Sequence, residues 1–120
     1  MRDLLNFFKI IGDENRLRIL LMLKIRPLCV CEIHEALSIA LSTISQHLKL
    51  MKSAGLIEDS KDGRWVIYSL KITDSFQREI LDILEKKMKD DPQIMKDRNF
   101  ISTTTREICS IKFKSSQKQE

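Results

Sequence analysis

The fold is decided by residues 41–70, LSTISQHLKLMKSAGLIEDSKDGRWVIYSL. Apolar residues recur at helical spacing in the first part, at Ile44, Leu48 and Met51. This pattern ends at Gly55, whose missing Cβ suits the left-handed position that follows a helix. Two runs rich in Ile, Val, Trp and Tyr come next, at 56–60 and 64–70, and Lys61-Asp62-Gly63 between them contains the Asp-Gly pair typical of tight hairpins. These residues therefore predict a helix followed directly by a two-stranded β-hairpin.

Three further helices are predicted before residue 41. They cover roughly 3–11, 14 to the residue before Pro27, and 32–37, with an extended piece at 28–31. The apolar stripe of the first contains Leu4, Phe7, Phe8 and Ile11. The expected N-caps are Asp3, Asp13 and, for the helix inside 41–55, Ser42 or Thr43.

A longer amphipathic helix is predicted after the hairpin, opened by Asp74 and Gln77. Its apolar stripe contains Phe76, Ile80, Ile83, Leu84 and Met88. The stripe is wider than a lone exposed helix needs, so we expect a partner to cover it. Beyond it, the pattern allows a short helix at 93–98, a loop at 102–105, a strand or extended segment through Cys109, Ile111 and Phe113, and disorder from Ser115.

The composition agrees with one mainly helical domain. The chain has 120 residues with 42% apolar and only 6% aromatic content, three Gly and two Pro, and a net charge of +4. We expect a winged helix-turn-helix of about five to six helices with a two-stranded wing at 1–91, and a C-terminal extension at 92–120 that carries Cys109. No apolar run resembles a membrane span or a signal peptide, so a cytosolic protein is expected. Three cysteines in a reducing compartment favour packing or thiolate chemistry over a disulfide framework.

A helix-turn-helix with a wing predicts DNA binding, because the second helix of such a unit places its first turn in the major groove. The side chains expected there are Ser42, Thr43, Ser45, Gln46 and His47. Gln46 is assigned the main base contact, since an amide can pair bidentately with adenine. Phosphate contacts are expected from Lys49, Lys52, Lys61 and Arg64. The alternatives are a solvated basic face and, for His47, a phosphate contact or core packing.

Three motifs resemble the ArsR/SmtB family of metal-sensing repressors in order and spacing. They are Gly12-Asp13-Glu14-Asn15-Arg16-Leu17-Arg18-Ile19-Leu20, Ser45-Gln46-His47-Leu48-Lys49 and Gly55-Leu56-Ile57. The resemblance spans roughly residues 3–90. It implies a homodimer that pairs the first and fifth helices, near Phe7 and Ile80, and a palindromic operator in double-stranded DNA.

The cysteines at 29 and 31 are the candidate sensor. On an extended segment, i and i+2 side chains point the same way, so both sulfurs can converge on one soft ion. The start of a helix also lowers a thiol pKa, and we therefore expect Cys31 to ionise readily. Inert burial of two small thiols is the alternative. The run Cys29-Val30-Cys31-Glu32-Ile33 resembles the sensor box of the arsenic(III) and of the cadmium and lead branches of the family.

The third ligand is where this chain departs from the arsenic pattern. That pattern has a further cysteine three residues after the second, and this chain has His34 there. Cys109 is the remaining thiol, from the same or the other protomer, and is expected to complete an arsenic(III) or antimony(III) site, although two thiolates are also chemically possible. His34 is the possible fourth ligand if the ion is zinc or cadmium. No permanent cofactor is expected.

By the same resemblance, the ligands that this sequence lacks narrow the choice of ion. The zinc, nickel and cobalt sensors of the family carry His and acidic ligands on the dimer helix, and residues 74–89 contain no His. Its cadmium and lead sensors add cysteines near the N-terminus, and none precedes Cys29. Two other interpretations remain. One is a sensor of oxidation or sulfide, in which a bridge links Cys29 or Cys31 to Cys109. The other is a regulator that binds no ligand. An enzyme is not expected, because this sequence lacks the βαβ pattern in which a thiol oxidoreductase would place its cysteines.

Overall fold

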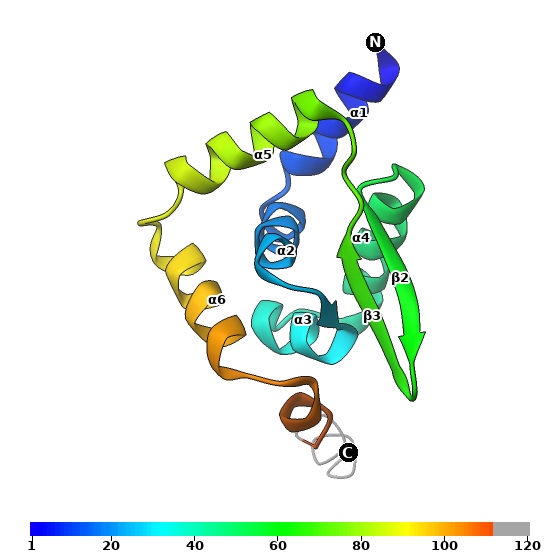
Figure 1. Cartoon of the computed structure of the whole chain (residues 1–120), viewed down its shortest axis with the longest axis vertical. Helices are drawn as coiled ribbons and strands as arrows, with labels where there is room; N and C mark the ends of the chain where they lie inside the picture. The colour runs from blue at the N-terminus through cyan, green and yellow to red at the C-terminus, as the bar shows by residue number, and fades with distance from the viewer. Residues whose placement is uncertain (112–120) are drawn as a thin grey trace.

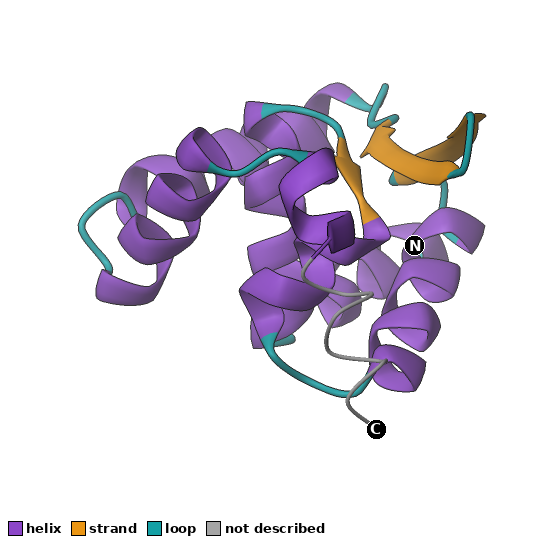
Figure 2. Ribbon diagram, turned by 90° about the horizontal axis from the view of Figure 1, so that it is seen from below, coloured by secondary structure: helices purple, strands orange, loops and turns teal. Residues whose placement is uncertain are grey.

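The computed structural model describes residues 1–111. Its helices are α1 (Arg2–Ile11), α2 (Glu14–Ile25), α3 (Val30–Leu37), α4 (Leu41–Ser53), α5 (Ser75–Lys87) and α6 (Pro92–Thr103), and residues 106–111 are also helical. The strands are β1 (Leu28–Cys29), β2 (Ile57–Asp62) and β3 (Trp65–Leu70). Figures 1 and 2 show the strands at one edge of the molecule and helices over the rest. The predicted class, mainly helical with a small β-hairpin, is confirmed.

Helix α2 lies at the centre of the molecule, surrounded by the other helices (Figure 1). Every residue from 18 to 23 is buried, and a helix without a polar face is stable only when other elements cover it. Its buried Arg18 donates two hydrogen bonds of 2.8 Å to Asp97 of α6 and one of 3.0 Å to the carbonyl of Ala36. The ion pair with Asp97 therefore fixes α6 against α2, and the hydrogen bond to Ala36 fixes α3. Within residues 1–111, no helix has the length and apolar character needed to cross a bilayer.

Helix starts follow the predicted caps in part. The carboxylates of Asp13 and Asp74 accept backbone hydrogen bonds at the starts of α2 and α5, as predicted. The predicted caps Asp3, Ser42 and Thr43 are wrong, because α1 starts at Arg2 and α4 at Leu41. In α4 the amides of residues 43 and 44 both donate to the carbonyl of Ala40, so the helix closes its first turn before either hydroxyl residue. Ser42 and Thr43 consequently lie inside that turn.

The first strand of the hairpin ends two residues later than predicted, and the turn is shifted accordingly. Asp62 pairs with Trp65, which makes Gly63-Arg64 the two-residue turn, and Gly63 has a φ of 62° that a side chain would disfavour. Only residues 28 and 29 of the extended piece predicted at 28–31 form a strand, β1, because α3 begins at Val30 and includes Cys31. Cys29 pairs with Ile67 of β3, and the sheet order is β1-β3-β2. Through this pairing, one cysteine of the candidate sensor sits in the same sheet as the wing.

The C-terminal part differs most from prediction. Helix α6 continues to Thr103, beyond the predicted end at 98, so only 104 and 105 of the predicted loop are irregular. The predicted strand is wrong, since Cys109 and Ile111 lie on the helical residues 106–111 and only Cys109 faces the core. Phe113 and the residues from Ser115 lie outside the described part. The division at 91 and 92 stays a prediction, and α6 packs against α2.

Candidate nucleic-acid interface and thiol site

The outer face of α4 is polar and accessible. Its exposed residues include Ser42, Thr43, Ser45, Gln46 and Lys49. The opposite face, formed by Ile44, Leu48 and Met51, is buried as predicted. No acidic residue occurs between 41 and 57, and Lys49 is positively charged. The net charge of this face is therefore positive, which favours contact with phosphates.

Two residues predicted on this face have other contacts. His47 is half-buried, and its Nδ1 lies 3.5 Å from Nη1 of Arg16. Because Arg16 also donates to the carbonyls of Lys9 and Ile10, His47 belongs to a group that joins α4 to α1 and α2. The ammonium of Lys52 lies 2.8 Å from a carboxylate oxygen of Asp59 on β2, so its charge is partly offset.

The wing carries the other predicted basic residues. Lys61 is exposed on β2. Arg64 is exposed in the turn, and its guanidinium lies 4.6 Å from the centroid of the Trp65 ring. A planar cation over an indole face is a favourable arrangement, so the turn arginine is held against the wing.

The two sensor cysteines stand where β1 becomes α3. Cys29 is buried at the N-cap of α3, and Cys31 is half-buried in its first turn. Burial raises the pKa of Cys29, and a hydrogen bond shared with Cys31 raises it further. Burial also raises the pKa of Cys31. The predicted readily ionised Cys31 is therefore wrong, because the loss of hydration outweighs the dipole at the start of this helix.

The third thiol, Cys109, reaches the same helix from the C-terminal side. It is buried, and its Sγ donates to Oε2 of Glu35 on α3 at 3.0 Å and lies 3.2 Å from Oγ1 of Thr104. Burial and the Glu35 carboxylate raise the pKa of Cys109 to about 12. Near it, Sγ of Cys31 lies 3.9 Å from the carbonyl oxygen of Arg106.

A pocket of about 250 Å³ opens between the thiols and the wing. Its lining includes Cys29, Cys31, His34, Trp65 and Ser110. His34 thus lies beside the two sensor cysteines. In the described part of the chain, no three His, Cys, Asp or Glu side chains are already arranged around a point that could hold a metal ion. Capture of an ion by three of these groups requires a movement of at least one of them.

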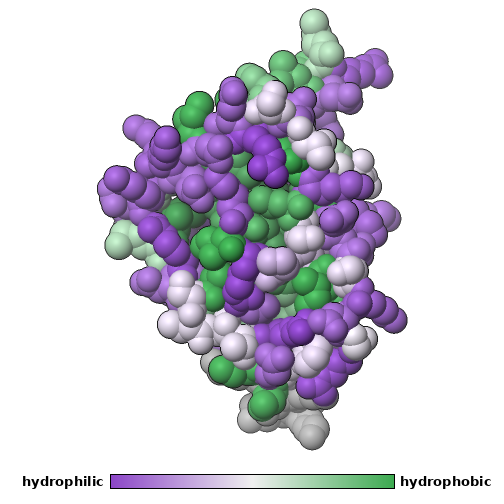
Figure 3. All heavy atoms as spheres, in the orientation of Figure 1, coloured by the Kyte–Doolittle hydropathy of each residue, from purple (hydrophilic) through white to green (hydrophobic). Residues whose placement is uncertain are grey.

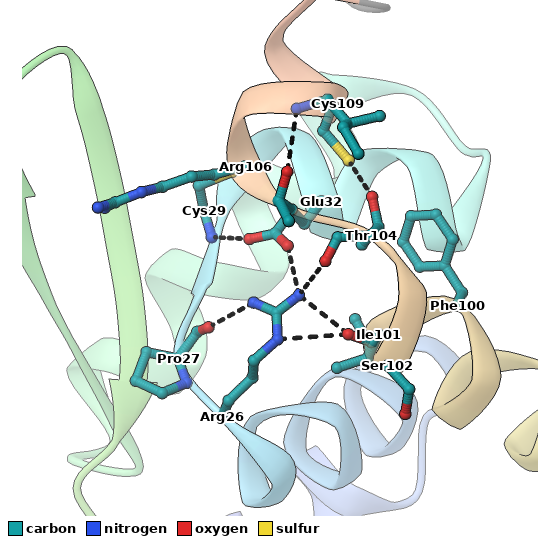
Figure 4. A network of polar contacts seen from close by, with 12 residues as sticks. Arg26, Pro27, Cys29, Glu32, Phe100, Ile101, Ser102, Thr104, Arg106 and Cys109 are labelled. Carbon is teal, nitrogen blue, oxygen red and sulfur yellow. Dashed lines mark hydrogen bonds and ion pairs between the residues drawn. The ribbon is translucent and has the colours of Figure 1, made fainter.

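Sequence reasoning missed the ion pair that organises this region, shown in Figure 4. Glu32 is 1% exposed, and its carboxylate accepts from the Cys29 amide at 3.1 Å and from Arg26 at 2.6 Å. The same Arg26 guanidinium donates to the carbonyls of Ile101 and Thr104, and so holds the segment that leads to Cys109. Glu32 stands at the third helical position after the N-cap Cys29, which is capping-box spacing, so this part of the network could have been found.

A helix-turn-helix with an exposed polar second helix, followed by a hairpin that carries Lys61 and Arg64 near its turn, defines a winged-helix transcriptional regulator. The sequence model described as "Bacterial regulatory protein, arsR family" matches residues 13–59. The chain is also 30% identical to the transcriptional regulator HlyU from Vibrio vulnificus CMCP6, with a TM-score of 0.61 over 69% of this chain and 84% of that one. The chain belongs to the arsR family of bacterial regulatory proteins.

Two curated relatives differ in the ion that their names give. The arsenical resistance operon repressor of Escherichia coli (strain K12) is 45% identical over 67 residues, 55% of this chain and 57% of that protein. The cadmium resistance transcriptional regulatory protein CadC of Listeria innocua is 41% identical over 66 residues, 54% of this chain and 56% of that protein. The chain therefore spans less than two thirds of either relative. Family and relatives are transcriptional regulators, which agrees with the prediction that the chain is not an enzyme.

The thiol environments predict an order of alkylation by iodoacetamide at pH 7.5. A raised pKa lowers the fraction of reactive thiolate, so all three cysteines should react at least about tenfold more slowly in the folded chain than in urea. Cys31, the half-buried one, should react before Cys29 and Cys109. Peptide mass spectrometry at timed intervals measures the order. Fast labelling of Cys29 in the folded chain would contradict this description of the site.

Proposed function

We propose that the chain is a homodimeric repressor that binds operator DNA and releases it when Cys29, Cys31 and Cys109 capture arsenic(III) or antimony(III). The observation that carries the proposal is the gathering of all three thiols at one helix. Two interact with each other at the start of α3, and the third donates to Glu35 further along the same helix. Because α3 packs against α4, a movement at these thiols reaches the helix that would enter the groove.

The chemistry of arsenous acid suits protonated thiols. It exchanges each of three hydroxides for a thiolate, so three arsenic–sulfur bonds form and three arsenic–oxygen bonds break. The three thiol protons leave in three water molecules, and no oxidant or reductant is needed. Soft thiolates are the protein ligands best matched to such an ion.

In DNA binding, the exposed face of α4 recognises bases, and Lys49 together with the wing contacts the DNA backbone. Gln46 reads a base edge, Ser42, Thr43 and Ser45 contact base edges or phosphates, and Lys49 with Lys61 and Arg64 holds the backbone. Lys52 and His47 have smaller direct roles, since one is paired with Asp59 and the other lies beside Arg16.

Substitutions on α4 test this division. With palindromic DNA selected by the wild-type chain, Gln46→Ala should weaken binding roughly 10- to 100-fold and relax the preference at one base pair. Lys49→Ala should weaken binding to all sequences and reduce the slope of log affinity against log salt by about one. Lys96→Ala, on the exposed side of α6, serves as the matched control. An unchanged sequence preference in Gln46→Ala would disprove its role in base recognition.

The dimer forms through the apolar end of the molecule made by α1 and α5. The large apolar side chains exposed there are Leu4, Leu5, Phe8, Phe76 and Ile83, and Figure 3 shows green atoms reaching the surface at this end. Phe8 and Phe76 meet edge to face with centroids 6.2 Å apart, which joins the two helices into one surface. Phe7, expected at this interface, is 2% exposed and packs in the protomer's own core, so Phe8 takes its place beside the half-buried Ile80.

Charge placed on this surface should separate the protomers. The double variant Phe8→Glu, Phe76→Glu should sediment as a monomer at concentrations where the wild type is a dimer, because a dimer would bury both carboxylates. Met95→Glu introduces the same charge at an exposed apolar site of α6 and should leave the dimer intact. Circular dichroism checks that the variants are folded. Equal sedimentation of the double variant and the wild type would remove α1 and α5 from the interface.

Cysteine variants test the sensing part. Wild-type chain should release its DNA with one equivalent of arsenite, and Cys29→Ser, Cys31→Ser and Cys109→Ser should each bind DNA normally but require at least about tenfold more arsenite. Gel shifts with arsenite, antimonite, cadmium and zinc measure this, with bound ion counted by mass spectrometry. A response lost only in the first two variants would remove Cys109, and retention of full DNA affinity with stoichiometric arsenite bound would reject the proposal.

The second candidate ion is cadmium, or zinc or lead, because His34 lies in the same pocket as Cys29 and Cys31 and a cadmium regulator is among the relatives. Under this alternative, cadmium releases the DNA at lower concentration than arsenite, and His34→Gln weakens the cadmium response. A disulfide between Cys109 and either sensor cysteine after peroxide or sulfide treatment would instead support a redox input.

A further inference from the structure

The helical residues 106–111 lie between the thiol site and the wing. On the wing side, two guanidiniums contact the Trp65 ring, with Arg64 at 4.6 Å and Arg106 at 4.7 Å from its centroid. The indole Nε1 donates to Oγ of Ser110 at 3.2 Å, and Arg106 pairs with Asp62 at 2.6 Å. The segment therefore contacts both strands of the wing close to their turn.

The same helical turns contact the sensor on their other side. Cys109 donates to Glu35 of α3, and the Arg106 carbonyl accepts from the Cys31 thiol. Cys109 and Ser110 are neighbours on one helical segment. A movement of the Cys109 thiol away from Glu35 would therefore also move the Ser110 hydroxyl that accepts from Trp65. At its start, this piece is tied to the fold through Thr104, whose carbonyl accepts from Arg26.

We infer that residues 104–111 transmit ion capture to the wing, so that drawing Cys109 to Cys29 and Cys31 detaches Arg106 and Ser110 from Trp65. This inference rests on the proposed function. It adds a route from the thiols to DNA that runs through the wing, beside the contact of α3 with α4.

The present partners of Cys109 lead to such a detachment. Thiolates bind a soft ion at about 2.3 Å, so three sulfurs on one ion lie within roughly 4 to 5 Å of one another. Cys109 is held by Glu35, one turn along α3 from Cys31, and residues at that spacing are about 5–6 Å apart. To join the ion, the Cys109 sulfur must leave Glu35 and turn toward Cys31, and a displacement of about 1 Å at the neighbouring Ser110 already exceeds what a hydrogen bond of 3.2 Å tolerates. The contact of Ser110 with Trp65 and the pairing of Arg106 with Asp62 then break together.

The charges give the consequence for DNA. Arg106 offsets the carboxylate of Asp62 at the tip of the wing, where Lys61 and Arg64 are expected to meet phosphates. When Arg106 withdraws, that carboxylate is left facing the same phosphates, and the Trp65 ring that supports Arg64 loses its contact with Arg106. A wing that is less positive and less fixed binds DNA less tightly.

Trp65 is the one tryptophan of the chain and reports the contact directly. In the full-length dimer without DNA, one equivalent of arsenite should shift Trp65 emission to longer wavelength and raise its quenching by acrylamide about twofold. Arg106→Gln and Ser110→Ala should show the shifted emission without ion. Arg106→Gln should also bind DNA about tenfold more weakly without ion and lose little more when arsenite is added. Arg98→Gln removes an exposed arginine of α6 and should behave as the wild type.

The outcomes separate this inference from the proposed function. If arsenite binds and releases DNA while Trp65 emission and quenching stay unchanged, the inference is wrong and the repressor proposal stands. An Arg106→Gln variant with wild-type DNA affinity and full arsenite response would also overturn it. If no ion binds the wild-type chain, the proposed function falls and the inference with it. Ion bound by Cys109→Ser without a change at Trp65 would support the inference, because the ion alone then does not alter the indole.

Discussion

The pairing of Glu32 with Arg26 is the constraint around which the sensor region is arranged. A carboxylate that is 1% exposed is costly unless its oxygens are satisfied, and here one accepts from the Cys29 amide and the other from Arg26. Arg26 then has donors left for carbonyls at the end of α6 and in the loop after it. One buried charge thus fixes the start of α3 and the approach of the C-terminal segment at once.

This arrangement explains how thiols far apart in the sequence come together although residues 1–111 contain no preformed metal site. Cys29 is held by β1 and Cys31 by α3, while Cys109 arrives on a segment joined to the core through hydrogen bonds to Arg26, Glu35 and Trp65. The first two belong to the rigid part, because β1 pairs with β3 and α3 is tied to α2 by Arg18. The C-terminal segment is joined to this part by side-chain hydrogen bonds and an ion pair rather than by strand pairing, and under the proposal it is the part that moves.

Local signals predicted much of the fold. The caps Asp13 and Asp74, the buried face of α4 and the hairpin all follow from patterns a few residues long, and tertiary contacts did not override them. The errors arise where distant residues decide. Alternation at 109 and 111 predicted a strand, but Glu35 and Trp65 select a helix there through contacts that no local window contains.

The candidate site shows the same division. Spacing identified Cys29, Cys31 and the exposed side chains of α4, whereas their surroundings depended on packing. The pKa of Cys31 rises because β1, α3 and the C-terminal segment remove its hydration, and a local rule on helix dipoles contains no information about that burial. Phe7 and Phe8 are equivalent in an apolar stripe, and only the position of α2 decides which of them faces the core.

Under the proposed mechanism, the attachment of the C-terminal segment also limits how tightly an ion is held. Part of the free energy gained from a third sulfur is spent on breaking the bonds of Cys109 to Glu35 and of Ser110 to Trp65. In this proposal, regulation comes from the difference between the two arrangements, since an ion bound equally well by both would leave DNA affinity unchanged. A coupling of about 1–3 kcal/mol, which is typical between two sites, corresponds to the net loss of a few such partly buried contacts. In this proposal, stronger attachment of residues 104–111 would make the repressor insensitive to the ion, and a segment without these contacts would leave the wing unsupported on DNA.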